Sequence, residues 1–163
     1  NDLLIHYDMP REEMKEKQEA IQAEVKKVAK EIIKDGMSDL EKEIAINDYL
    51  CRSAAYDDAA LENAEKNDFK SVDESFSDSF NAYGILLKKK GVCASYAASF
   101  KLLADEAGLD SIVVTGYLNG NVPHAWNRVH IDGQWLTSTA RIMTMRLCVT
   151  LCSIFLTKSP EVH

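Results

Sequence analysis

Apolar residues recur at helical spacing through the first third of the chain. Pro10 followed by Arg11-Glu12-Glu13 is typical of a helix start, because proline is tolerated in the first turn and acids are favoured at the positive end of the helix dipole. The spacing predicts an amphipathic helix that ends at Gly36. Ser38 and Glu41 form a capping-box pattern, which predicts a second helix running to about Cys51. The apolar positions of the first helix are Met14, Ile21, Val25, Val28 and Ile32.

The middle of the chain is more mixed. Residues 56–79 are largely polar and predict a short helix with loops, and residues 80–87 are predicted to be helical. The sequence Gly91-Val92-Cys93 interrupts this pattern, and a new helix follows that ends at Gly108. One face of that helix is apolar, formed by Tyr96, Phe100, Leu103 and Ala107.

After the last predicted helix the period changes. Residues 111–118 are rich in β-branched side chains and predict a strand, and 119–121 form a turn signal. Residues 124–131 predict a second strand, Asp132-Gly133 a hairpin turn, and the segment from Gln134 a third strand. Helices followed by an antiparallel sheet define the α+β class.

Composition narrows the function classes. The 163 residues are 46% hydrophobic, which suits a compact core, and we expect Trp126 and Trp135 to lie in it. The net charge of -7 disfavours nucleic acid or an anionic membrane as the partner. The apolar run of residues 142–156 is too short to span a membrane and contains Arg146, so no membrane span is expected.

The four cysteines are too few for a disulfide framework in a chain of this length. Only Cys148 and Cys152 are close in sequence, and no histidine follows them at zinc-finger spacing. We therefore expect no metal site and no cofactor.

Cys93 and His124 are the candidate reactive groups. Cys93 falls in the first turn of a predicted helix, where the backbone N–H groups and the helix dipole stabilise a thiolate. The same N–H groups could hold a developing oxyanion. His124 follows Pro123 at the start of a predicted strand, which would present the imidazole rigidly to a thiol. On burial statistics alone, a small buried thiol and a structural histidine are the commoner alternatives.

Several segments resemble bacterial domains of the transglutaminase-like superfamily, over about residues 40–136. The nucleophile segment is similar in 82–84, 90–93, 95–97 and 100–108, and the histidine segment in His124-Ala125-Trp126-Asn127, Val129, Asp132-Gly133 and Trp135. Residues 46–50 and 55–57 resemble the helix and loop that precede them. The resemblance implies a papain-like α+β fold, with Cys93 as nucleophile and His124 as general base and acid. It also implies acyl transfer on a protein or peptide, either hydrolysis or glutamine transamidation.

The third catalytic position departs from the family pattern. The family carries an aspartate four residues after the tryptophan matched to Trp135, and here that position is Thr139. Threonine can accept a hydrogen bond from imidazole, but it cannot stabilise imidazolium by charge. Loss of the acid in a serine protease lowers kcat by about four orders of magnitude, so we expect an impaired catalyst. Tyr83 is a candidate additional oxyanion donor.

The sequence after Thr137 is unlike the rest and matches no family pattern. Codons for residues 137–145 can be chosen so that reading from the third base gives Val-Asp-Ser-Thr-Asn-Asn-Asp-Asp, which restores the missing aspartate. Our hypothesis is a single-base loss near codon 137. It would be refuted if a second isolate carried intact codons for the printed chain. We divide the chain into an N-terminal helix (1–37), a core (38–140) and an apolar tail (141–163) that would favour self-association.

Three interpretations remain open. The first is a cysteine protease or transglutaminase, and the second is a degenerate module that binds peptide or glycan in the same cleft. The third makes the helix of residues 10–35 a docking arm. The resemblance implies a bacterial surface or secreted setting, although the chain opens on Asn1-Asp2 without a signal peptide.

Overall fold

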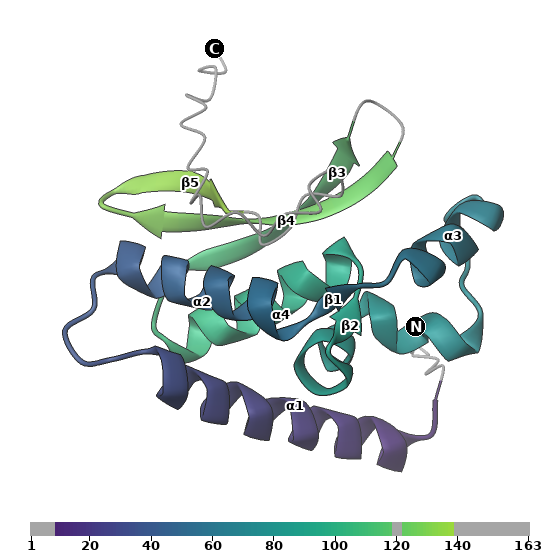
Figure 1. Ribbon diagram of the computed structural model, residues 1–163, viewed down its shortest axis with the longest axis horizontal. Coiled ribbons are helices and arrows are strands. Elements are labelled where there is room, and N and C mark those ends of the chain that lie inside the picture. The colour runs from purple at the N-terminus through teal and green to yellow at the C-terminus, as the bar shows by residue number, and fades with distance from the viewer. Residues whose placement is uncertain (1–8, 119–121, 139–163) are drawn as a thin grey trace, which may run out of the picture.

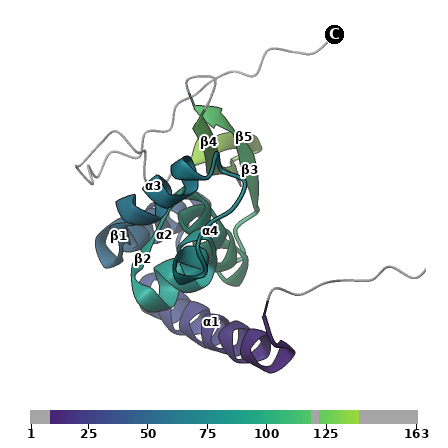
Figure 2. The ribbon, with the colours of Figure 1, turned by 90° about the vertical axis from the view of Figure 1, so that its right-hand side faces the viewer.

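The computed structural model describes residues 9–118 and 122–138. The expected turn at 119–121, Thr139, the apolar tail and the frameshift hypothesis lie outside these residues. Figure 1 shows α1 along one side, α2 and α4 in the middle and a three-stranded sheet on the other side, and the turned view of Figure 2 gives the same order. In chain order the elements are α1 (Arg11–Ile32), α2 (Asp39–Ser53), β1 (Ala55–Tyr56), α3 (Asp58–Lys66), the 3₁₀-helix η1 (Glu74–Phe80), the π-helix η2 (Gly84–Lys88), β2 (Lys90–Gly91), α4 (Cys93–Glu106), β3 (Ser111–Leu118), β4 (Val122–Ile131) and β5 (Gln134–Ser138). The expected α+β class is confirmed.

The predicted capping box is present at the start of α2. Ser38 Oγ accepts from the Glu41 N–H at 3.3 Å, and the Ser38 N–H donates to the Glu41 carboxylate at 2.8 Å. The predicted end of α1 was wrong by four residues, because Ile33 is already extended and Gly36 lies in the following turn. An extended backbone at this point lets Ile32 and Ile33 both pack against the core.

The sheet has the order β3-β4-β5 and both pairs are antiparallel. Asp132 and Gly133 both have positive φ angles, 50° and 78°, as the two-residue turn between β4 and β5 requires. β4 begins two residues earlier than expected, at Val122, so His124 lies inside the strand. Every residue of β3 therefore has a partner on β4.

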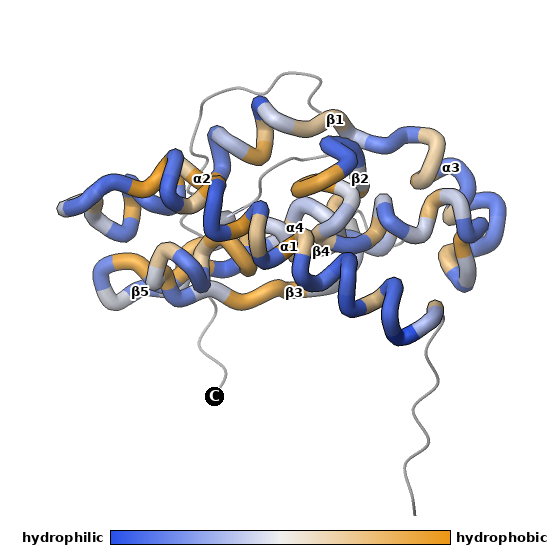
Figure 3. Tube along the Cα trace, turned by 90° about the horizontal axis from the view of Figure 1, so that it is seen from below, coloured by the Kyte–Doolittle hydropathy of each residue, from blue (hydrophilic) through white to orange (hydrophobic). Residues whose placement is uncertain are grey.

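Helix α4 is the centre of the core and contacts α1, α2, β3 and β4. Phe100 and Leu103 of α4 are fully buried, and Val25 and Val28 place α1 on the same core. Figure 3 shows hydrophilic colouring over much of α1, in keeping with a helix that buries a narrow stripe. In the part of the chain that the structure describes, no helix combines the length and apolar character needed to cross a bilayer.

The expectation that Trp135 is a core aromatic was wrong. Its side chain is 43% exposed and packs against the ring of His130, its partner on β4, with the ring centroids 5.3 Å apart. β5 is an edge strand of the sheet, so one of its faces can remain open to solvent.

Candidate active site

Cys93 is the first residue of α4 and is half-buried. The preceding Val92 is extended, and no side chain caps the N-terminus of the helix. The N–H groups of the first turn therefore have no side-chain cap competing with the thiol or a bound substrate. These N–H groups can therefore donate to an anionic group bound beside Cys93.

The turn into α4 depends on the close approach of Gly91 and Ser95. A Cβ at Gly91 would lie 2.6 Å from Ser95 Oγ and 2.7 Å from its Cβ, closer than real side chains come. Ser95 is fully buried, donates to the Asn81 carbonyl and accepts from the Ile85 N–H at 3.2 Å. The Ser95 hydroxyl joins α4 to Asn81 and to Ile85 of η2, so position 91 has no room for a Cβ and needs a glycine.

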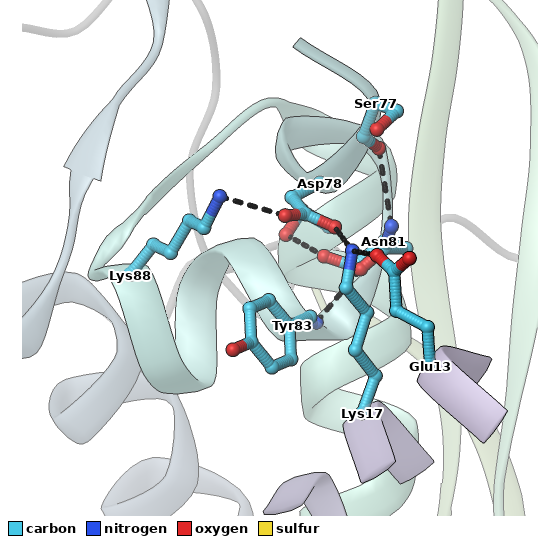
Figure 4. Close-up of polar contacts among 8 residues, drawn as sticks. Glu13, Lys17, Ser77, Asp78, Asn81, Tyr83 and Lys88 are labelled. Atoms are coloured by element: carbon cyan, nitrogen blue, oxygen red, sulfur yellow. Dashed lines mark hydrogen bonds and ion pairs between the residues drawn. The ribbon is translucent and has the colours of Figure 1, made fainter. Parts of the chain in front are cut away.

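A buried carboxylate ties α1 to the segment that precedes Cys93. Asp78 pairs with Lys17 at 2.9 Å and with Lys88 at 2.7 Å, as Figure 4 shows. Burial by itself raises the pKa of Asp78, but Lys88 and Lys17 outweigh it and hold the pKa below its ordinary value. The ring of Tyr83 lies in this cluster, with the two ammonium groups 5.3 and 5.9 Å from its centroid. Tyr83 is not among the residues that line the cavity around Cys93.

The strand that carries His124 is fixed to the helix that carries Cys93. Asn127 Nδ2 donates to the Ala97 carbonyl at 3.0 Å in a buried hydrogen bond. Ala97 lies one helical turn beyond Cys93, and Asn127 lies three residues beyond His124. Cys93 and His124 line the same cavity, so the structure brings the two predicted residues together.

The surroundings of His124 favour the neutral form of its imidazole. Its side chain lies among buried groups, with the residue 6% exposed, and burial lowers the pKa of the ring below its ordinary value. Its Nδ1 is buried and has no hydrogen-bond partner among the described residues. The ring stacks on Trp126 with the centroids 5.9 Å apart. A buried polar atom without a hydrogen-bond partner is uncommon in folded proteins.

Tyr56 is a site residue whose role the sequence reasoning missed. Its half-buried ring stacks on Tyr96 at 6.4 Å between centroids, and its phenol lies beside Cys93. Burial first, and then the neighbouring Cys93, raises the pKa of this phenol well above its ordinary value, so it remains a hydrogen-bond donor at neutral pH. Tyr56 belonged to a recognised segment, but nothing in the sequence placed it next to the thiol.

The short parallel pair β1–β2 explains how Tyr56 reaches Cys93. Tyr56 pairs with Gly91, two residues before the thiol. The next residue, Asp57, is buried and bonds to Ser79 at 2.7 Å and Lys90 at 2.8 Å. Burial by itself raises the pKa of Asp57, but the opposite effect of Lys90 and Ser79 is larger. The pKa is therefore below its ordinary value and the carboxylate stays ionised. Strands of two residues are too short to show a hydrophobic period, so this pairing could not be predicted from the sequence.

The cavity next to the thiol has a volume of about 590 Å³ and is lined mainly by apolar side chains from α3, the loop after it, η1, β3 and β4. Within residues 9–118 and 122–138, no group of three His, Cys, Asp or Glu side chains gathers as a metal ion would require. The reactive groups that line this cavity are the Cys93 thiol and the His124 imidazole. The Tyr56 phenol lies beside Cys93, but Tyr56, like Tyr83, is not among the lining residues.

A helix that begins with a cysteine, packed on an antiparallel sheet that carries a buried histidine, is the arrangement of cysteine-dependent acyl-transfer domains. The model of the transglutaminase-like superfamily matches residues 26–140, and the chain belongs to this superfamily. The resemblance found in the sequence is confirmed.

Curated relatives match at modest identity. Kyphoscoliosis peptidase of Mus musculus is 26% identical over 129 residues, which cover 72% of this chain and 18% of that protein. The Homo sapiens protein of the same name is 28% identical over 116 residues, covering 64% of this chain and 16% of that protein. The chain thus matches less than a fifth of the length of these relatives.

Two solved structures share the fold. A crystal structure of a TGase superposes with a TM-score of 0.59 at 20% identity, over 87% of this chain and 36% of that one. A putative cysteine protease from Cytophaga hutchinsonii superposes with a TM-score of 0.53 at 21% identity, over 73% of this chain and 37% of that one. Both likenesses confirm the transglutaminase-like fold.

Proposed function

We propose that this chain is a cysteine-dependent acyl-transfer domain acting on a protein or peptide. The sulfur of Cys93 attacks the carbonyl carbon of the acyl donor while His124 takes the thiol proton. The imidazolium then gives that proton to the departing amine, which leaves a thioester on Cys93. Water or a primary amine attacks the thioester, His124 takes the proton of this nucleophile, and the thiol is restored.

Two donors would stabilise the oxyanion in this mechanism. One is the backbone N–H of Cys93, at the uncapped start of α4. The other is the Tyr56 phenol, which is kept protonated by its raised pKa. Tyr83 is the poorer candidate, because its ring lies against Lys17 and Lys88.

The observation that carries the proposal is the shared cavity of Cys93 and a buried His124 at the N-terminus of α4. Membership of a superfamily with cysteine-protease-like and transglutaminase folds supports it. The names of the mammalian relatives support a peptidase reaction in particular.

The test is the rate at which iodoacetamide alkylates Cys93 as a function of pH, measured by peptide-level mass spectrometry. A His124→Ala variant is the comparison, and Cys51 in the same digest is the internal control. A reactive pair gives a rate for Cys93 that exceeds the rate for Cys51 and falls in the variant. A rate that follows an ordinary thiol with a pKa near 8.5, unaffected by the substitution, rejects the proposal.

A degenerate binding module is the second candidate, and the unpartnered Nδ1 of His124 favours it. In that case the cleft would hold peptide or glycan and Cys93 would be an ordinary thiol. Turnover separates the two candidates. Peptide hydrolysis or amine incorporation that disappears in Cys93→Ser supports the enzyme, and binding without either reaction supports the module.

A further inference from the structure

The cavity that holds Cys93 and His124 extends well beyond the two reactive groups. Its volume of about 590 Å³ lies within the range of small-ligand sites, roughly 300–1,000 Å³. A thiol that attacked only a small exposed carbonyl would need no such space. The additional volume is large enough to hold another part of the acyl donor, such as a side chain next to the scissile bond.

The walls of this cavity are apolar on both sides of the thiol. One wall comes from α3, the loop that follows it and η1, and the other comes from the facing ends of β3 and β4. The polar lining residues Lys70, Ser71 and Thr115 are all exposed to solvent. The Lys70 ammonium group also pairs with Asp68 at 3.4 Å. The side chains that form these walls include Leu61, Ala64, Phe69, Val72, Tyr117 and Pro123.

Phe69 is held in place by its backbone. Its φ angle is 57° and that of Asp68 is 52°, a left-handed conformation that is rare for a bulky residue and costs energy. The Phe69 N–H donates to the Ala64 carbonyl at 2.8 Å, which closes the turn after α3. Asn63 and Asp73 exchange two hydrogen bonds of 2.6 and 2.9 Å across the ends of the loop. The loop thus fixes an aromatic side chain, 38% exposed, at the cavity.

We propose that this cavity binds a large apolar side chain, of the leucine or phenylalanine kind, from the acyl-donor peptide, at or next to the scissile carbonyl. The inference rests on the proposed function, since it assigns a substrate class to that same site. An apolar side chain gains from leaving water in such a cavity. The amide of a glutamine would lose hydrogen bonds to water against walls that are mainly apolar. The substrate is therefore an apolar peptide segment, in preference to a glutamine side chain.

The experiment uses acetyl-dipeptidyl chloromethyl ketones. The ketone of the reagent takes the place of the scissile carbonyl, and the thiol attacks the adjacent chloromethyl carbon with loss of chloride. Each of the two residues is varied in turn among Leu, Phe, Ala, Gln and Glu, and the second-order rate of Cys93 modification is measured by mass spectrometry. We expect Leu or Phe at one position to react at least about tenfold faster than Ala, and Gln to react no faster than Ala.

Phe69→Ala should remove most of the preference for Leu or Phe over Ala. Phe76→Ala is the matched control, because Phe76 is a half-buried aromatic of η1 that does not line the cavity. Equal rates for all reagents, a preference for Gln, or a preference that survives Phe69→Ala would overturn the inference. These results leave the proposed function standing if iodoacetamide still shows dependence on His124. Loss of that dependence rejects the proposed function itself.

Discussion

The side chain of Asn127 donates a buried hydrogen bond of 3.0 Å to the carbonyl of Ala97, and this bond joins the strand of the candidate base to the helix of the candidate nucleophile. Asn127 is 1% exposed, so water does not replace the bond when it is lost. The relative position of Cys93 and His124 depends on how β4 sits on α4. This one contact is therefore relevant both to stability and to reactivity.

We expect Asn127→Ala to lower the free energy of unfolding by about 1–3 kcal/mol, because it leaves a buried carbonyl with one partner fewer. Urea denaturation measures the change, and the iodoacetamide rate at Cys93 should fall with it. Arg128→Ala is the control, since Arg128 bonds to the Trp135 carbonyl in an exposed position and its loss should change stability by no more than about 0.5 kcal/mol. Equal effects of the two variants would contradict this role for Asn127.

Gly91→Ala should disturb the turn into α4. The new Cβ would lie 2.6 Å from Ser95 Oγ, and Ser95 is buried and bonded on both sides of its hydroxyl. Overpacking of this kind costs about 1–3 kcal/mol, and the shift of the turn should slow alkylation of Cys93.

The control for Gly91→Ala is Gly36→Ala, and thermal unfolding and the alkylation rate of Cys93 are measured for both variants. At Gly36 nothing lies within 4 Å of the added Cβ, and the cost comes only from its φ of 85°. The control should therefore lose stability without a change at Cys93. If Gly91→Ala retains full reactivity, the close approach to Ser95 does not position the thiol.

The neutral state of His124 predicts a pH dependence of stability. Burial lowers the pKa of His124 in the folded protein, whereas the unfolded chain takes up this proton near pH 6.5. The unfolded state then binds more protons in acid, so stability falls as the pH drops below about 6.5 and continues to fall to the folded pKa. Above about pH 7, His124 is neutral in both states and does not make the stability depend on pH.

Urea denaturation of the wild type and of His124→Gln between pH 5 and 7.5 isolates this contribution. The wild type should lose more stability than the variant on acidification. Asp57 and Asp78 have lowered pKa values, so their contributions to stability are lost only at lower pH. This loss is the same in the wild type and in His124→Gln. A difference between the two proteins that does not change with pH would contradict a buried neutral imidazole.

Introducing an aspartate at position 139 should increase the reactivity of Cys93 with His124. Thr139→Asp would introduce a carboxylate at the third catalytic position predicted from the sequence resemblance, and a carboxylate beside an imidazole raises its pKa. We expect the alkylation rate of Cys93 at pH 6 to rise at least about tenfold, given the four orders of magnitude lost with the acid in the serine-protease case. Thr139→Asn is the uncharged control. No gain in Thr139→Asp would mean that residue 139 does not reach His124 in this chain, as the frameshift hypothesis allows.

The parts of the site that could be predicted from the sequence have strong local signals. Asp132-Gly133 predicts its turn because both residues tolerate positive φ, and the capping box fixes the start of α2. Cys93 and His124 were found through segments whose local pattern and family resemblance agree, and the structure places them in one cavity. Their catalytic roles remain a prediction.

What the sequence left out depends on contacts between distant segments. The pairing of Tyr56 with Gly91 joins residues 35 positions apart through strands too short to show a period. The exposure of Trp135 follows from the position of β5 at the sheet edge, which residue type alone does not reveal. The aromatic wall at Phe69 depends on a left-handed backbone held by Asn63 and Asp73.

Replacing Tyr56 and Tyr83 separately by phenylalanine tests which phenol stabilises the oxyanion. Tyr56→Phe keeps the ring that stacks on Tyr96 and removes only the hydroxyl beside Cys93. If the phenol stabilises the oxyanion, kcat for a peptide ester should fall, with the loss of about 10²–10³ for an oxyanion-hole donor as the upper range. Alkylation by iodoacetamide, which forms no oxyanion, should change far less. Tyr83→Phe is the matched control and should leave kcat unchanged, because that ring lies between Lys17 and Lys88. An equal loss in both variants, or a loss only in Tyr83→Phe, would return the donor role to Tyr83.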